Sequence, residues 1–284
     1  MALIKYWGKK DEILRLPENG SISIILAGLD TITTVQFDED LRSDQVTIQG
    51  ESEEGEANRV SKHLDKIRQL ANSSCFARVV SENTFPKGTG LSSSGSGFAA
   101  LTIASTLALD LNLSQKELSI LARQGSGTAC RCVCGGFVEW KDGATSETSY
   151  SETLYDKNYW DLRDVVVVVD EGKKDVSSTQ GHATAQTSVA FAERQRRIGA
   201  KITLTKQLIA EKNFSQLGQL LEAEALEFHS ILLTSTPPMI AWYPGTIQVM
   251  REVLALRSEG VLRVPCLSWT PWATTLPSVK AFSS

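Results

Sequence analysis

Two clusters of glycine and serine stand directly before sequence with a helical pattern, which is where a protein backbone can bind an anion. The first is Phe85-Pro-Lys-Gly-Thr-Gly-Leu-Ser-Ser-Ser-Gly-Ser-Gly97, and the largely apolar segment 98–109 follows it without a break. N–H groups at the start of a helix are unpaired and partly positive, and glycine lets the main chain approach a phosphate closely. The hydroxyls of Ser93, Ser94 and Ser96 can add donors or reach a bound Mg²⁺.

A flexible linker is the alternative for this stretch, because its composition alone is also typical of a spacer. A linker should be followed by more polar sequence, whereas here a core helix begins at once. We therefore favour a phosphate cradle. It is not a Walker A loop, since no Gly-Lys-Ser/Thr closes it.

The second cluster, Gly125-Ser-Gly127, precedes Arg131. It offers another anion-binding backbone, and a planar guanidinium suits a carboxylate because two N–H groups engage two oxygens. Arg131 could instead simply cap a helix, but the glycines favour a binding role. Other cationic groups are available at Lys5, Lys9, Lys10, Lys173 and Lys174, of which Lys10 and Lys174 are expected to be solvated neighbours.

Cysteine and histidine point only weakly to other chemistry. A C-x-C-x-C spacing without a matching pair elsewhere does not favour zinc, and small buried thiols are common. The histidines lack partner ligands, and no Ser-His-Asp or paired-carboxylate arrangement follows from the spacing. The residues concerned are Cys130, Cys132, Cys134, His63, His182 and His229.

Composition narrows the class of protein. The chain has 284 residues, of which 42% are hydrophobic, enough for a substantial core. Its net charge of -4 provides no basic field for nonspecific nucleic-acid binding. Five cysteines without a hydrophobic signal segment indicate free thiols in a reducing compartment, and the longest strongly apolar run, 165–169, is too short to span a membrane. We expect a soluble, cytoplasmic protein.

The elements that must position these residues follow from periodicity. Ser114 and Glu117 form a capping-box pattern that predicts a helix from about Gln115 to Gln124. Strands are expected over 21–26, 33–37, 46–49, 75–80, 135–140 and 165–169, further helices over 59–71, 183–198, 202–211, 214–232 and 246–256, and polar connections over 51–58 and 141–161. The pattern predicts an α+β chain in two lobes, 1–155 and 156–284.

The loop Pro86-Lys-Gly-Thr-Gly-Leu-Ser-Ser-Ser94 resembles the ATP-binding loop of the GHMP kinase superfamily. Ala2-Leu-Ile-Lys-Tyr-Trp-Gly-Lys9 is similar to the N-terminal signature of mevalonate diphosphate decarboxylases, as are 123–131 with 135–140, 176–181 and 237–242. These five motifs stand in the family's order. The resemblance implies a GHMP kinase-like two-lobe fold, with a ribosomal S5-like N-terminal lobe and a ferredoxin-like α/β C-terminal lobe that is incomplete or aberrant at its end.

The resemblance also implies a reaction. The family uses ATP and Mg²⁺ to phosphorylate the 3-hydroxyl of mevalonate 5-diphosphate, after which loss of phosphate and CO₂ gives isopentenyl diphosphate, in the mevalonate pathway of isoprenoid and sterol biosynthesis. It further implies a homodimer. A mevalonate or phosphomevalonate kinase, a phosphomevalonate decarboxylase and an inactive anion-binding homologue remain as alternatives.

The resemblance assigns roles to residues of this chain. Lys5, Ser93, Ser94 and Arg131 are the implied catalytic residues, with Ser94 at the metal. The implied substrate-binding residues are Tyr6, Trp7 and Lys9 at the diphosphate end, Ser126, Thr128 and Arg131 around the mevalonyl part, and Ser178 and Thr179. The implied ATP-binding residues are Pro86, Gly88, Gly90, Leu91, Ser92, Ser93, Ser94 and Gly95. Tyr6 and Trp7 could alternatively be ordinary core aromatics.

The resemblance fails at both ends. The family begins with a strand carrying Asn-Ile, where this chain has Met1. After Glu259 no Asp or Glu occurs, so the family aspartate that orients or deprotonates the 3-hydroxyl is absent, and 261–284 form a divergent tail. Shifting the reading frame of the codons for 269–273 yields Asp, a small residue, an apolar residue and Gly. A frameshift near 261–265 is therefore our hypothesis, to be tested by reading the gene in that frame.

Overall fold

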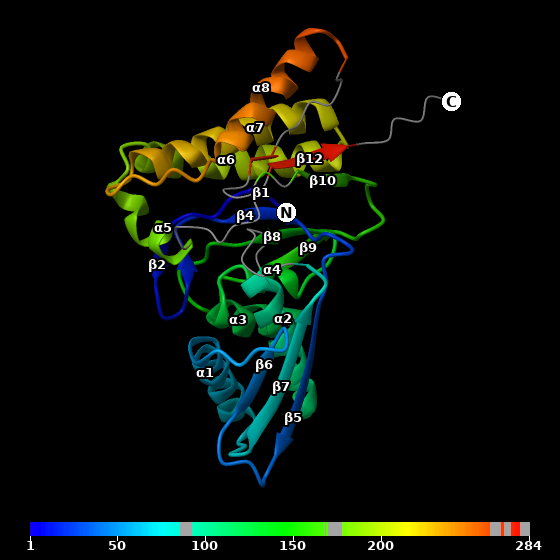
Figure 1. Ribbon diagram of the computed structural model, residues 1–284, viewed down its shortest axis with the longest axis vertical. Coiled ribbons are helices and arrows are strands. Elements are labelled where there is room, and N and C mark those ends of the chain that lie inside the picture. The colour runs from blue at the N-terminus through cyan, green and yellow to red at the C-terminus, as the bar shows by residue number, and fades with distance from the viewer. Residues whose placement is uncertain (86–92, 168, 170–177, 262–267, 270–273, 279–284) are drawn as a thin grey trace.

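The computed structural model describes residues 1–85, 93–167, 169, 178–261, 268–269 and 274–278. Figure 1 shows a central sheet with a strand-and-helix layer on one side and a group of long helices on the other. The central sheet has the antiparallel order β1 (Ala2–Ile4), β4 (Ser21–Ile24), β8 (Phe137–Trp140) and β9 (Ser151–Tyr155). The α+β fold class is confirmed.

The layer at the lower end of Figure 1 is a second sheet covered by helices. Its order is β5 (Thr31–Asp38), β7 (Phe76–Asn83) and β6 (Gln45–Ile48), with β6 parallel to β7. Its helices are α1 (Glu54–Ala71), α2 (Ser93–Ala108), α3 (Gln115–Gly125) and the short α4 (Ala129–Cys132). Val60, Leu64 and Ile67 recur at helical spacing on the buried face of α1, and Val60 and Leu64 share an apolar cluster with Val79 and Phe98.

A group of helices lies at the upper end of Figure 1, on the other side of the central sheet. They are α6 (Phe191–Ala210), α7 (Phe214–Thr234) and α8 (Pro244–Ser258), preceded by α5 (Ser178–Thr184) and the 3₁₀ turn η1 (Ala185–Thr187). Ile4 and Ile22 of the sheet meet Ile209 of α6 and Leu217 of α7 in one apolar core. Both the start of the chain and its second half therefore build the centre of the molecule.

Two smaller strand groups complete the fold. They are the hairpin β2 (Lys9–Asp11) and β3 (Leu16–Pro17), and the antiparallel set β10 (Arg163–Val167), β12 (Thr274–Ser278) and β11 (Ser268–Trp269). Most of the tail 261–284, including 262–265 of the proposed frameshift, lies outside the described residues. Within the tail, β12 pairs with β10 over its whole length.

Three sequence predictions need correction. Helix α1 begins at Glu54 rather than Arg59, because acidic residues are favourable in a first turn and Glu54 and Glu56 lie there. The polar connection 141–161 contains strand β9, which pairing with β8 stabilises without apolar periodicity. The two helices expected over 183–198 and 202–211 are one helix, α6 from Phe191, because Gly199 inside it does not break the helix.

No helix in the described part of the chain is both long and apolar enough to cross a membrane.

Candidate active site

The two glycine–serine clusters meet in space. We call residues 93–95 at the start of α2 the first bend, and residues 126–128 between α3 and α4 the second bend. The hydroxyl oxygens of Ser94 and Ser126 are 3.4 Å apart. A Cβ added at Gly95 would lie 2.6 Å from Oγ1 of Thr128, so only glycine permits this approach without movement. Helix α2 begins inside the first cluster, which contradicts a free spacer up to residue 97.

Tyr6 joins the second bend to the start of the chain. A Cβ on Gly127 would lie 2.8 Å from the Tyr6 hydroxyl oxygen, and the Tyr6 ring packs on Trp140 with centroids 4.7 Å apart. Burial is the main reason that the pKa of the Tyr6 hydroxyl is raised well above its usual range, so the hydroxyl stays protonated. We call residues 5–9 the N-terminal signature. It lies against the second bend.

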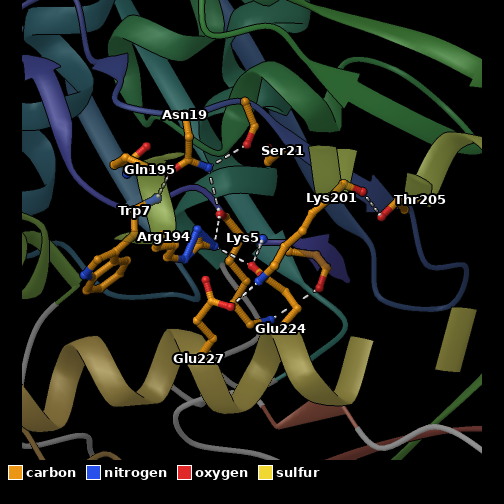
Figure 2. A network of polar contacts seen from close by, with 12 residues as sticks. Lys5, Trp7, Asn19, Ser21, Arg194, Gln195, Lys201, Thr205, Glu224 and Glu227 are labelled. Carbon is orange, nitrogen blue, oxygen red and sulfur yellow. Dashed lines mark hydrogen bonds and ion pairs between the residues drawn. The ribbon is translucent and has the colours of Figure 1, made fainter. Parts of the chain in front are cut away.

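The main chain of the N-terminal signature is held from the side of the long helices, as Figure 2 shows. Arg194 Nη2 of α6 donates to the Lys5 carbonyl at 2.8 Å, and Asn19 Nδ2 donates to the same oxygen at 3.0 Å. The Lys5 N–H donates to Glu224 Oε1 of α7 at 3.3 Å. Asn19 Oδ1 also accepts from the N–H of Trp7 at 3.4 Å. Both peptide groups of Lys5 therefore have fixed partners.

A buried ion network supports these contacts. Glu224 is paired with Arg194 through Oε1 and with Lys201 through Oε2, the latter at 3.0 Å, and Lys201 also pairs with Glu227 (Figure 2). The Arg194 and Glu224 side chains are 0% and 1% exposed, so neither charge has water as an alternative partner. Sequence reasoning missed these residues. The available signal was a charged residue on the otherwise apolar buried face of each helix.

Lys5 itself is buried, and its ammonium group donates to the Ala2 carbonyl at 3.3 Å. Burial lowers the pKa of Lys5 to about 8; the Glu224 carboxylate opposes this shift, while the positive charges of Arg131 and Arg194 add to it. Lys5 thus remains mainly cationic at neutral pH. A cation that is poorly solvated by the protein gains strongly from an incoming anion.

Arg131 lies on α4, behind the second bend, and is 8% exposed. Its Nη1 donates to the hydroxyls of Ser23, at 2.7 Å, and Ser21, at 3.3 Å, both on β4. Within the described residues, no acceptor binds its remaining guanidinium N–H groups. The Arg131 side chain is thus oriented by β4, and its remaining N–H groups can bind a ligand. This arrangement agrees better with ligand binding than with helix capping.

The two lysines that follow Trp7 differ. Lys9 forms an ion pair with Glu12 at 2.6 Å, and its side chain is only 4% exposed. Lys10 is exposed, as expected, and donates to the Asp142 carbonyl. An anion at Lys9 would therefore either displace Glu12 from the ammonium group or share that group with Glu12.

Sequence reasoning also passed over His182, which had been considered only as a metal ligand. Its ring packs against the rings of both Tyr6 and Trp7, with centroids 4.5 and 4.2 Å away. A Cβ on Gly181 would lie 2.6 Å from the Trp7 ring, so this glycine lets α5 approach the N-terminal signature. The pairing joins residues about 175 positions apart, which no local pattern could reveal.

Several predicted residues lie outside what the structure describes. They are Pro86, Gly88, Gly90, Leu91 and Ser92, and also Lys173 and Lys174. Ser178 and Thr179 begin α5, but their side chains are outside the described set as well. Burial raises the pKa of Cys130 and of Cys134 to about 12, and over the described ranges no group of three His, Cys, Asp or Glu side chains could hold a metal ion.

Comparison with solved structures defines the class of protein. Mevalonate diphosphate decarboxylase from Staphylococcus aureus matches with a TM-score of 0.92 and 37% identity, over 99% of this chain and 85% of that one. A complex described as MDDEF with MVAPP, AMPPCP and magnesium matches with a TM-score of 0.90 and 37% identity, over 99% and 86%. The chain thus has the two-lobe α+β fold of the GHMP type that was predicted.

Sequence comparisons define the family. A family model for the diphosphomevalonate decarboxylase-like N-terminal domain matches residues 1–151, and one for the mevalonate 5-diphosphate decarboxylase C-terminal domain matches 164–256. The diphosphomevalonate decarboxylase of Candida albicans is 34% identical over 92% of this chain and 77% of its own length. The phosphomevalonate decarboxylase of Haloferax volcanii is 35% identical over 91% and 79%. The chain belongs to the diphosphomevalonate decarboxylase family.

Proposed function

We propose that this chain is an ATP-dependent carboxy-lyase that converts mevalonate 5-diphosphate and ATP to isopentenyl diphosphate, ADP, phosphate and CO₂. The observation that carries the proposal is the convergence of both bends and the N-terminal signature on one site, with Lys5 and Arg131 as buried cations. Two highly charged anions must bind side by side in this reaction, and the site offers backbone and cationic donors for both.

ATP and Mg²⁺ fit the first bend. The N–H groups at the start of α2 have no earlier helical turn to bond to, and the missing side chain of Gly95 leaves the backbone close to Thr128. Ser94 is exposed there, so its hydroxyl can reach the metal or a phosphate oxygen. The loop 86–92 with Ser93 completes the proposed ATP site. When bound, MgATP supplies the phosphoryl group and neutralises its charge.

The substrate fits the second bend and the N-terminal signature. Arg131 is assigned to the carboxylate, with Ser126 and Thr128 along the mevalonyl part. The diphosphate is assigned to Tyr6, Trp7 and Lys9, and Ser178 and Thr179 remain proposed contributors. This order is supported by the contact of Ser126 with Ser94, since the 3-hydroxyl must approach the phosphoryl donor.

Decarboxylation follows from these positions. As the 3-oxygen leaves with the transferred phosphoryl group, the electron pair of the bond to the carboxylate becomes the new double bond and CO₂ is released. Arg131 orients the carboxylate for this step, and Lys5 stabilises negative charge between the anions. Because no Asp or Glu follows Glu259, no carboxylate there can deprotonate the 3-hydroxyl, and we expect a reduced rate for this sequence.

A coupled assay with both candidate substrates tests the proposal. Mevalonate 5-diphosphate with MgATP should give ADP and CO₂ in equal amounts, and mevalonate 5-phosphate should give little of either. ADP without CO₂ would identify a kinase, turnover of the monophosphate would identify a phosphomevalonate decarboxylase, and neither product would leave only an anion-binding protein. Arg131→Gln should abolish CO₂ release, whereas the exposed control Lys10→Gln should retain it.

We also infer a cytoplasmic homodimer. The five cysteines suit a reducing compartment, and Cys75, Cys130, Cys132 and Cys134 are free thiols. Sedimentation analysis should give twice the mass of the 31.0 kDa chain.

A further inference from the structure

His182 connects the second half of the chain to the proposed diphosphate end of the site. His182 is 7% exposed, and its imidazole ring is stacked on Tyr6 at an interplanar angle of 25° and packs against Trp7 at 34°. Tyr6 in turn touches Gly127 of the second bend. The ring therefore occupies a fixed position within the candidate site, although sequence reasoning gave it no role.

The hydrogen bond to Gly8 determines the tautomer of His182. The N–H of Gly8 donates to Nδ1 at 3.1 Å, so Nδ1 is an acceptor and the proton of the neutral ring lies on Nε2. Over the described ranges, hydrogen bonding of the His182 ring is seen at Nδ1 and not at Nε2. The Nε2–H is thus an oriented donor for which the described residues provide no acceptor.

The charges around His182 favour an anion beside it. Burial, followed by the positive charges of Lys9 and Arg15, lowers the pKa of His182 to about 3, so the ring is neutral at physiological pH. The phenol of Tyr6 is the other titratable group that packs on the ring, and it also stays neutral. The two cations that disfavour an imidazolium ion would stabilise a phosphate at the same place, where the phosphate would share Lys9 with the carboxylate of Glu12.

We propose that His182 donates its Nε2–H to a phosphate oxygen of the substrate and, through the stack with Tyr6 and Trp7, positions the N-terminal signature against that phosphate. His182 would then be a substrate-binding residue supplied by α5, opposite the second bend. A neutral donor gives this contact direction without adding a third buried positive charge beside Lys9 and Arg15. The inference rests on the proposed function for the identity of the substrate.

Histidine-selective NMR tests the contact without turnover. The chain has only three histidines, and the other two have protein partners, His63 with Thr102 and His229 with Trp242. Protein labelled with ¹⁵N-histidine is titrated with inorganic pyrophosphate, and binding is followed in parallel by calorimetry. We expect the His182 ring signals to shift and its pKa to rise on binding, because an anion favours the imidazolium form. The signals of His63 and His229 should stay in place.

Three substitutions of His182 distinguish the role of the Nε2–H donor from that of ring stacking. His182→Gln keeps an N–H donor near the position of Nε2, His182→Asn keeps only an acceptor near Nδ1 for Gly8, and His182→Phe keeps only the stacked ring. A hydrogen bond to a charged group predicts a loss of pyrophosphate affinity of about tenfold or more in the Asn and Phe variants, and of less than about threefold in the Gln variant. Thermal melts check that each variant folds. If the Phe variant does not fold, the Asn variant alone tests the loss of the Nε2–H donor.

The outcomes are distinct. Pyrophosphate binding that leaves the His182 signals unmoved would overturn the inference, as would no binding at all, or an equal loss of affinity in all three folded variants. Movement of the His182 signals without CO₂ release from mevalonate 5-diphosphate would uphold the anion contact and reject the proposed function instead.

Discussion

The two bends and the N-terminal signature reach the same site by different physical means. The bends meet through backbone proximity, with Gly95 against Thr128 and Gly127 against the Tyr6 hydroxyl. The N-terminal signature is held by charged and amide side chains of distant segments, chiefly Arg194 and Glu224. One arrangement requires small residues; the other requires buried charges of opposite sign in contact with one another.

This difference determines how each region should respond to substitution. Adding a methyl group to a bend forces a close contact, and the response depends on whether one neighbour can yield. Removing one member of the ion network leaves a buried charge without its partner, which lowers the free energy of unfolding more than an added methyl group in a bend does. A substitution in a bend should therefore have a local effect that a second substitution can reverse. A substitution in the ion network should also disturb the packing of α6 against α7.

The largest effect is expected for Glu224→Gln. It leaves Arg194 without its buried ionic partner and weakens the pairing of Lys201, so the free energy of unfolding should fall by about 3–5 kcal/mol in urea denaturation. The matched control is Glu193→Gln, which breaks an exposed pair with Arg196 on the same helix and should cost less than about 1 kcal/mol. Equal losses in the two variants would refute the distinction between the regions.

A pair of glycines in α2 gives the next largest effect. Gly95→Ala brings a methyl group against Thr128 and should destabilise the protein by about 1–3 kcal/mol. Gly97→Ala meets nothing within 4 Å and should stabilise the helix by about 0.5–1 kcal/mol. Thermal melts compare both variants with Gly95→Ala combined with Thr128→Ala, which removes the contacted oxygen and should restore part of the lost stability. If Gly95→Ala is as stable as Gly97→Ala, the bends are not in close contact.

Lys5 provides a pH test that links the two regions. Its ammonium group loses its proton as pH rises through about 8, so anion affinity that depends on Lys5 should fall by up to tenfold per pH unit above that value. Calorimetry with pyrophosphate measures this fall in affinity between pH 6.5 and 9.5, which is about 1.5 pH units on either side of the pKa of Lys5. Lys5→Met corrects for titration of the ligand itself. Because the Glu224 carboxylate raises the pKa of Lys5, any folded Glu224→Gln protein should show the fall at lower pH; an unchanged profile would contradict the coupling.

The smallest effect concerns a helix that only supports the second bend. Ser114 and Glu117 form a capping box at the start of α3, with the Ser114 N–H donating to Glu117 Oε2 at 2.8 Å. Ser114→Ala should cost about 1 kcal/mol in urea denaturation and leave pyrophosphate affinity unchanged. A large loss of affinity would mean that the second bend depends on the start of α3 more than its own contacts indicate.

The same comparison explains what the sequence could predict. The capping box is a local signal, and it correctly predicted the start of α3 at Gln115. The glycine–serine clusters and Arg131 were also identified from neighbouring residues. Strand β9 and the Arg194–Glu224 pair could not be found in this way, because pairing with β8 and burial between two helices are properties of the folded chain. The role of His182 depends likewise on contacts with Tyr6 and Trp7.

Hydrogen exchange with both ligands bound tests the central claim most directly. Mass spectrometry would follow amide protection in this chain when mevalonate 5-diphosphate and AMPPCP with magnesium are added together. We predict simultaneous protection of residues 5–9, 93–97 and 126–131, because all three segments bound one site. Binding heat accompanied by protection of only one of these segments would contradict the account.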